Sequence, residues 1–84
     1  MTLSLSVSPA AEDDLHEAVA WYDAQQPGLG DTFLRFVEAT LARVQRLPNA
    51  FPTREDGVRS ALLRRFPYGV LFRVGDKRIE VIAV

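Results

Sequence analysis

Apolar and polar residues alternate at the start of the chain. The alternation places Leu3, Leu5 and Val7 between Thr2, Ser4 and Ser6. This period of two predicts a short strand with one buried face. Ser8 and Pro9 then mark the start of a helix, because a serine hydroxyl caps a free amide and proline has no amide to satisfy. Apolar residues at helical spacing continue this helix to about Gln26.

A second helix is predicted from about Asp31, which we expect to cap it, to Leu47, just before Pro48. Its apolar residues fall on one side of a helix: Phe33, Phe36, Val37, Thr40, Leu41, Val44 and Leu47. Only a few residues around Pro27-Gly28 separate the two helices. The helices should therefore form an antiparallel hairpin.

Three strands are predicted after a loop at 48–57, over Val58–Arg65, Tyr68–Val74 and Arg78–Val84. Short turns connect them, so they should form an antiparallel meander. The order β-α-α-β-β-β predicts an α+β fold of one domain, 1–84, in which the helical hairpin covers one face of an antiparallel sheet. We also expect the last strand to present an exposed edge with which another chain could pair.

Charge is distributed unevenly along the 84 residues. Residues 1–50 have a balance of −4 and residues 51–84 a balance of +3, which indicates a charged partner surface. No cysteine is present to form a disulfide or a thiolate metal site. The N-terminus lacks the basic and apolar segments of a signal peptide, and no apolar run reaches the ~18 residues of a membrane span. We expect a cytoplasmic protein without cofactor or metal.

Arginine concentrates between positions 59 and 73, around a Phe66-Pro67-Tyr68 corner. Side chains alternate on strands, so Arg64 and Arg65 should lie on opposite faces. Arg73 should lie on the open sheet face with Arg59 and one of that pair. Guanidinium groups bind carboxylates and phosphates through paired hydrogen bonds. The candidate partner-binding residues here are Arg59, Arg64, Arg65, Tyr68 and Arg73. A solvated set of charges that protects the sheet edge is an equal alternative.

The first helix contains further candidates. Trp21 is either a partner-binding platform or a core residue, whereas Tyr22 is expected in the core. His16, the single histidine, falls off the apolar stripe and is expected to be solvated rather than catalytic. The acidic run Glu12-Asp13-Asp14 matches the positive end of the helix dipole, and this explanation is simpler than metal binding or imitation of phosphates.

Several short motifs follow one another in a recognisable order. They are Ser8-Pro9-Ala10-Ala11, Asp14-Leu15-x-Glu17-Ala18, Trp21-Tyr22, Pro27-Gly28-Leu29-Gly30-x-x-Phe33, Leu47-Pro48-x-x-Phe51-Pro52, Val58-Arg59, Arg65-Phe66-Pro67-Tyr68 and Val70-Leu71-Phe72-Arg73-Val74. The ordered series resembles the ParE/RelE superfamily of toxins from bacterial type II toxin–antitoxin systems, and especially its ParE (plasmid stabilisation) branch. The likeness spans nearly all of residues 7–84.

The resemblance implies the fold derived above and an antitoxin that wraps a peptide segment along the toxin. RelE-like members cut messenger RNA in the ribosome, whereas ParE-like members inhibit DNA gyrase. The ribonucleases commonly place a catalytic arginine directly after the tyrosine that opens the central strand, but here Gly69 follows Tyr68. RNA cleavage also needs a proton acceptor and a donor, and neither is expected beside these arginines. We therefore expect no catalytic residue.

Related sequences also continue beyond the last strand with a His-x-x-Arg-like run that these 84 residues lack, so we expect the family's C-terminal tail to be missing. The leading prediction is a ParE-like toxin that inhibits DNA gyrase by protein binding, without binding nucleic acid directly or a membrane. A ParD-like antitoxin would neutralise it in a hetero-oligomer. Two alternatives stay open: a RelE-like ribosome-dependent mRNA endoribonuclease, and a truncated, non-toxic module that only binds antitoxin.

Overall fold

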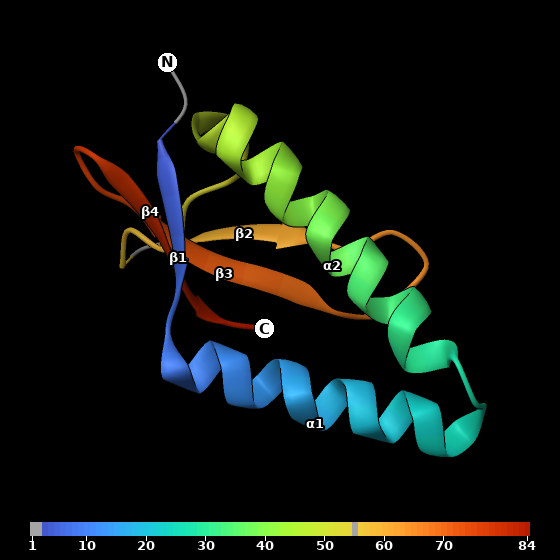
Figure 1. Cartoon of the computed structure of the whole chain (residues 1–84). Helices are drawn as coiled ribbons and strands as arrows, with labels where there is room; N and C mark the ends of the chain where they lie inside the picture. The colour runs from blue at the N-terminus through green and yellow to red at the C-terminus, as the bar shows by residue number, and fades with distance from the viewer. Residues whose placement is uncertain (1–2, 55) are drawn as a thin grey trace.

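The computed structural model describes residues 3–54 and 56–84. Its elements are β1 (Ser4–Val7), α1 (Pro9–Gln25), α2 (Leu29–Arg46), the short 3-10 helix η1 (Pro48–Ala50), β2 (Arg59–Leu62), β3 (Gly69–Val74) and β4 (Arg78–Ala83) (Figure 1). The predicted β-α-α-β-β-β order is confirmed. Thr2, which the alternation places in the first strand, and Glu55, in the loop at 48–57, lie outside the described residues.

Helix α1 begins as its sequence predicts. The Ser8 side-chain oxygen accepts a hydrogen bond from the Ala11 amide at 3.1 Å, and Pro9 occupies the first turn. Helix α2 begins differently. Gly28, in a left-handed conformation (φ 88°), occupies the cap position, so no side chain caps the first turn. The prediction that Asp31 caps α2 is therefore wrong, since Asp31 lies inside the first turn.

The four strands form one sheet in the order β1-β4-β3-β2. The meander β2-β3-β4 is antiparallel as predicted, and β1 adds to β4 in parallel, so the sheet is mixed. This parallel pairing aligns Leu5 with Ile79 and Val7 with Val81, which places apolar residues of both strands on one face. Strand β4 is consequently internal. The prediction that the last strand has an exposed edge is wrong, because the edges belong to β1 and β2.

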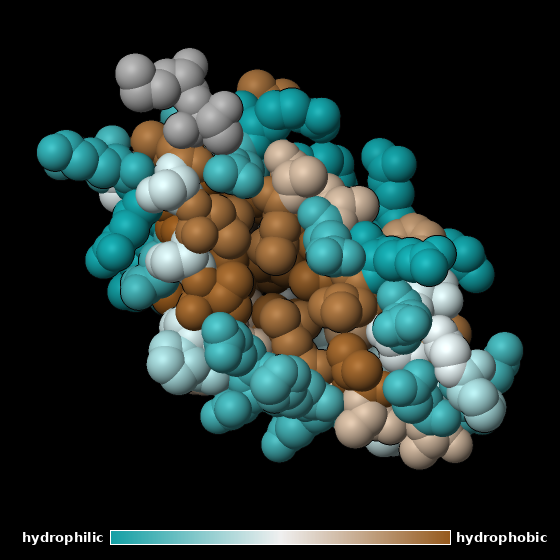
Figure 2. Space-filling view, in the orientation of Figure 1, coloured by the Kyte–Doolittle hydropathy of each residue, from teal (hydrophilic) through white to brown (hydrophobic). Residues whose placement is uncertain are grey.

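The core lies between the helical hairpin and the sheet. Its largest fully buried side chains come from α2, β3 and β4: Phe33, Phe72, Ile79, Val37, Val44, Val70 and Val81. Helix α1 contributes small residues, Ala11 and Ala18, which let it approach the sheet closely. Figure 2 shows apolar residues gathered between α1, α2 and β1, surrounded by hydrophilic ones. No helix of the described chain is long and apolar enough to cross a membrane.

Candidate partner-binding surfaces

The turn between β2 and β3 holds Arg64 and Arg65. Strand β2 ends at Leu62, three residues earlier than predicted, and the Leu63 amide donates to the Tyr68 carbonyl at 2.9 Å to close the turn. Arg65 has a left-handed backbone (φ 69°). Because both arginines lie in a turn rather than a strand, the prediction that they occupy opposite sheet faces does not apply. Both are exposed.

This turn packs over α2 and places its arginines beside an aromatic ring. The Arg65 guanidinium carbon lies 5.4 Å from the centre of the Phe36 ring, within the range of a cation–π interaction. Arg64 lines a neighbouring hollow of about 190 Å³. We call this hollow the arginine groove, and its lining residues are Phe36, Ala39, Thr40, Arg43 and Arg64.

Arg43 is the residue of this groove that sequence reasoning missed. Its guanidinium donates to the Thr40 hydroxyl and to the Leu62 carbonyl, both at 3.3 Å. These bonds hold the guanidinium between α2 and the outer edge of β2. Phe36 and Arg43 lie seven positions apart, so a shared helix face was visible in the sequence. The turn between β2 and β3, which supplies Arg64 to the groove, could not be predicted from the sequence.

The other two candidate arginines lie elsewhere. Arg59 pairs with the buried Phe72, so it lies on the helix-covered face, where it donates to the Phe51 carbonyl at 2.6 Å. The prediction that Arg59 joins Arg73 on the open face is therefore wrong. Arg73 is exposed on the open face, directly opposite Glu80 of β4. The four arginines thus do not form one patch.

Aromatic residues connect α1 to the turn. Tyr22 is buried as predicted, and its ring lies 5.0–5.1 Å from the rings of Trp21, Phe33 and Phe66. Burial, together with the neighbouring Tyr68, raises the pKa of the Tyr22 phenol. Trp21 is 56% exposed, so the alternative of core packing is wrong for this residue, and its role as a partner-binding platform stays a prediction.

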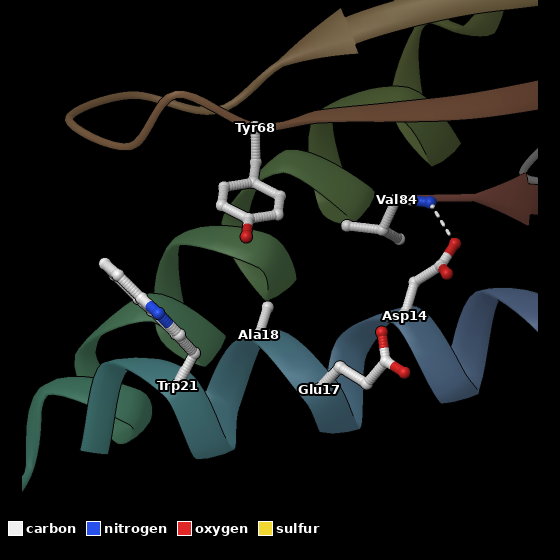
Figure 3. Close-up of a pocket in the computed structure, with 6 residues that line it drawn as sticks. All are labelled: Asp14, Glu17, Ala18, Trp21, Tyr68 and Val84. Carbon is white, nitrogen blue, oxygen red and sulfur yellow. Dashed lines mark hydrogen bonds between the residues drawn. The ribbon is translucent and has the colours of Figure 1, made fainter. Parts of the chain in front are cut away.

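A second hollow of about 270 Å³ lies where α1 faces the sheet. We call it the acid–aromatic hollow, and it is lined by Asp14, Glu17, Ala18, Trp21, Tyr68 and Val84. Figure 3 shows the Tyr68 phenol extending from the sheet toward α1, with Trp21 on one side and the two carboxylates on the other. The Val84 amide donates to the Asp14 carboxylate at 3.1 Å.

The two hollows have opposite chemistry. The arginine groove presents cations next to an apolar floor, which suits carboxylates of a partner. The acid–aromatic hollow presents carboxylates next to the exposed Trp21 ring and the half-buried Tyr68 ring. His16 is exposed on α1 and lines neither hollow. Within residues 3–54 and 56–84, no cluster of three or more His, Cys, Asp or Glu residues could hold a metal ion.

Comparison with known proteins identifies the family. A family model described as the ParE toxin of the type II toxin–antitoxin system, parDE, matches residues 5–84. Toxin ParE2 of Mycobacterium tuberculosis is 38% identical over 85 residues, which cover 100% of this chain and 81% of that protein. The two therefore share the whole length of the domain described above.

Solved structures agree with this comparison. The chromosomal ParDE system from P. aeruginosa superposes with a TM-score of 0.85 at 25% identity, covering 96% of this chain and 91% of that one. The RelBE2 toxin–antitoxin complex from Mycobacterium tuberculosis superposes with a TM-score of 0.64 at 21% identity, covering 99% and 95%, and shows the shared fold alone. This chain belongs to the ParE toxin family of type II toxin–antitoxin systems.

Proposed function

We propose that this ParE-family toxin acts by binding other proteins, with DNA gyrase as its target and a ParD-like antitoxin as its inhibitor. The arginine groove is the observation that carries this proposal. It places Arg43 and Arg64 beside Phe36, and its lining includes neither a histidine nor a carboxylate. Such a surface binds acidic groups but offers no proton acceptor for the cleavage of RNA.

The antitoxin, in this proposal, places an acidic amphipathic segment in the arginine groove. Its carboxylates pair with Arg43 and Arg64, and its apolar side chains contact Phe36 and Ala39. The half-buried apolar residues Leu15 and Leu41, which pack against the core, offer further apolar contact beside the helices. The two solved structures compared above are toxin–antitoxin systems, which supports a partner of this kind.

Matched arginine variants test this docking site. Arg64→Ala should weaken binding of the cognate antitoxin about tenfold, because it removes one cation from the groove without touching the core. Arg73→Ala removes another exposed arginine, from the open sheet face, and should leave the affinity within about twofold. Titration calorimetry measures both. Equal losses for the two variants, or a loss for Arg73→Ala alone, would place the antitoxin elsewhere.

The gyrase proposal also predicts what the toxin does not do. Gly69 opens β3 opposite Leu62, at the position where the ribonuclease branch is expected to have arginine. A Cβ atom at this position would lie 3.3 Å from a Leu62 methyl group, beside β2 and not in the arginine groove. Expression without antitoxin should therefore create no new 5′ ends in translated messages. Codon-phased ends detected by primer extension would favour the ribonuclease alternative.

A further inference from the structure

Helix α1 presents negative charge that no nearby cation in the sequence balances. Five acidic residues fall on this helix: Glu12, Asp13, Asp14, Glu17 and Asp23. Residues 1–34 contain no lysine or arginine. Asp23 already accepts the Gly30 amide at 2.8 Å, and one oxygen of Asp14 accepts the Val84 amide. The Glu17 carboxylate makes no such bond within the described chain and lines the acid–aromatic hollow.

Trp21 forms a fixed aromatic wall of the same hollow. Its ring contacts the Tyr22 ring edge-to-face, with 5.0 Å between centroids and 85° between planes. Tyr22 is itself held by stacking on the fully buried Phe33. The indole therefore rests on a rigid core and remains 56% exposed. Tryptophan, with tyrosine and arginine, is enriched among the few residues that contribute most of the binding energy of a protein interface.

Tyr68 and Ala18 complete the shape of the hollow. Ala18 is buried and small, so it leaves room between α1 and the sheet. Tyr68 is half-buried, and its hydroxyl points from the sheet toward α1 in Figure 3. Since the Tyr68 ring lies 5.1 Å from the Phe33 ring, the phenol rests on the same aromatic array as Trp21. The hollow is thus preformed by rings whose positions the core determines.

We propose that the acid–aromatic hollow binds an arginine side chain presented by an extended segment of a protein partner. The guanidinium stacks on the Trp21 indole and donates hydrogen bonds to the Glu17 carboxylate and the Tyr68 hydroxyl oxygen. Arginine suits this site better than lysine, because its planar head group stacks on a ring while its fork of N–H groups reaches a carboxylate.

Other occupants fit the same residues less well. Nucleic acid is repelled by the unbalanced carboxylates of α1. A hard divalent cation prefers six or more oxygen ligands, whereas the side chains that line the hollow supply two carboxylates, one of which already accepts the Val84 amide. With the arginine groove, the molecule has two recognition hollows of opposite charge. A partner that uses both carries acidic residues in one segment and an arginine in another.

The single tryptophan of the chain reports directly on this site. The probe is a blocked peptide, Ala-Arg-Ala, titrated into the isotope-labelled protein, and its neutral counterpart contains citrulline in place of arginine. The Trp21 indole N–H resonance should shift saturably with the arginine peptide, with a dissociation constant in the millimolar range for one head group. Citrulline should bind at least about fivefold more weakly, since the cation is missing. Equal shifts with both peptides would overturn the proposal.

Charge-neutralising variants identify the carboxylate. Glu17→Gln should weaken arginine-peptide binding about fivefold, and rising salt should then have less effect on the remaining affinity. Glu38→Gln, an equally conservative change at an exposed position of α2, serves as the matched control and should leave binding unchanged. Both side chains are exposed, so both variants should fold. An unaltered affinity in Glu17→Gln, or tighter binding of an Ala-Glu-Ala peptide than of the arginine peptide, would contradict the assignment.

Discussion

Four arginines between positions 59 and 73 have three different roles that follow from their local backbone. Arg64 and Arg65 project from a turn over α2, where Arg65 lies against the Phe36 ring. Arg59 is half-buried and donates to the Phe51 carbonyl, so it fastens the loop after η1 to the sheet. Arg73 lies in solvent opposite Glu80. The same residue type thus contacts an aromatic ring of α2, anchors a loop and carries surface charge within fifteen residues.

The anchoring role of Arg59 predicts a stability effect without a binding effect. Arg59→Met keeps an unbranched apolar stem but removes the guanidinium and its hydrogen bond to Phe51, and should lower the free energy of unfolding by about 1–2 kcal/mol. Urea denaturation measures this loss. Antitoxin affinity of the folded variant should equal that of the wild type. Unchanged stability together with weakened antitoxin binding would return Arg59 to the partner surface.

Side-chain roles could be predicted only in part. The burial of Tyr22 followed from helical spacing, and the solvation of His16 followed from its position off the apolar stripe. The face of the sheet on which Arg59 lies depends on its pairing with Phe72 of the neighbouring strand. The register of two strands could not be read from local sequence. Arg43 and Glu17 became candidates only once the turn and the sheet were placed beside the helices. In the sequence, each is only a charged residue on a predicted helix, and most charged residues on helices are simply solvated.

At the scale of elements, the connection between α1 and α2 sets the angle of the helical hairpin. The Gly30 amide donates to Asp23 at the end of α1, so the start of α2 is fastened to the preceding helix. A Cβ atom on Gly30 would lie 2.7 Å from the Val19 carbonyl oxygen, which is backbone of α1. Close approach of the two helices therefore requires glycine here.

Gly30→Ala should accordingly destabilise the protein by about 2 kcal/mol or more, because the helices must separate to admit the methyl group. Gly69→Ala is the matched control: its Cβ would lie 3.3 Å from a Leu62 methyl group that is largely exposed and free to rotate. This second variant should cost less than about 1 kcal/mol. Urea unfolding curves compare them, and equal destabilisation would show that the helix contact is not the determinant.

The helices and the meander were predictable because they depend on local periodicity and short turns. The internal position of β4 in the sheet was not predictable, because it results from parallel pairing with β1, which lies more than seventy residues away in the sequence. The end of β2 at Leu62 could not be predicted from the sequence either. Arg65 adopts a left-handed conformation, which an arginine shows only when the surrounding turn requires it. The first error concerned long-range pairing, and the second concerned the point at which a strand gives way to a turn.

At the scale of the whole molecule, the uneven charge of the sequence becomes two separate surfaces. The acidic first half places carboxylates on α1, around the acid–aromatic hollow. The basic second half folds back so that Arg64 meets Arg43 at the arginine groove. A near-neutral chain, with a net charge of −1, therefore presents opposite signs on different faces. Our proposal that the protein binds proteins of mixed charge rather than nucleic acid rests on this separation of charge.

The supercoiling activity of purified DNA gyrase shows whether this protein inhibits the enzyme. Relaxed plasmid is incubated with gyrase, ATP and increasing amounts of this protein, with or without the cognate antitoxin. Supercoiling should fall in proportion to the toxin added. Activity should return when antitoxin is supplied at a matching amount, and less completely when the toxin is the Arg64→Ala variant. Full supercoiling at a large molar excess of the folded toxin would contradict the assignment of gyrase as its target.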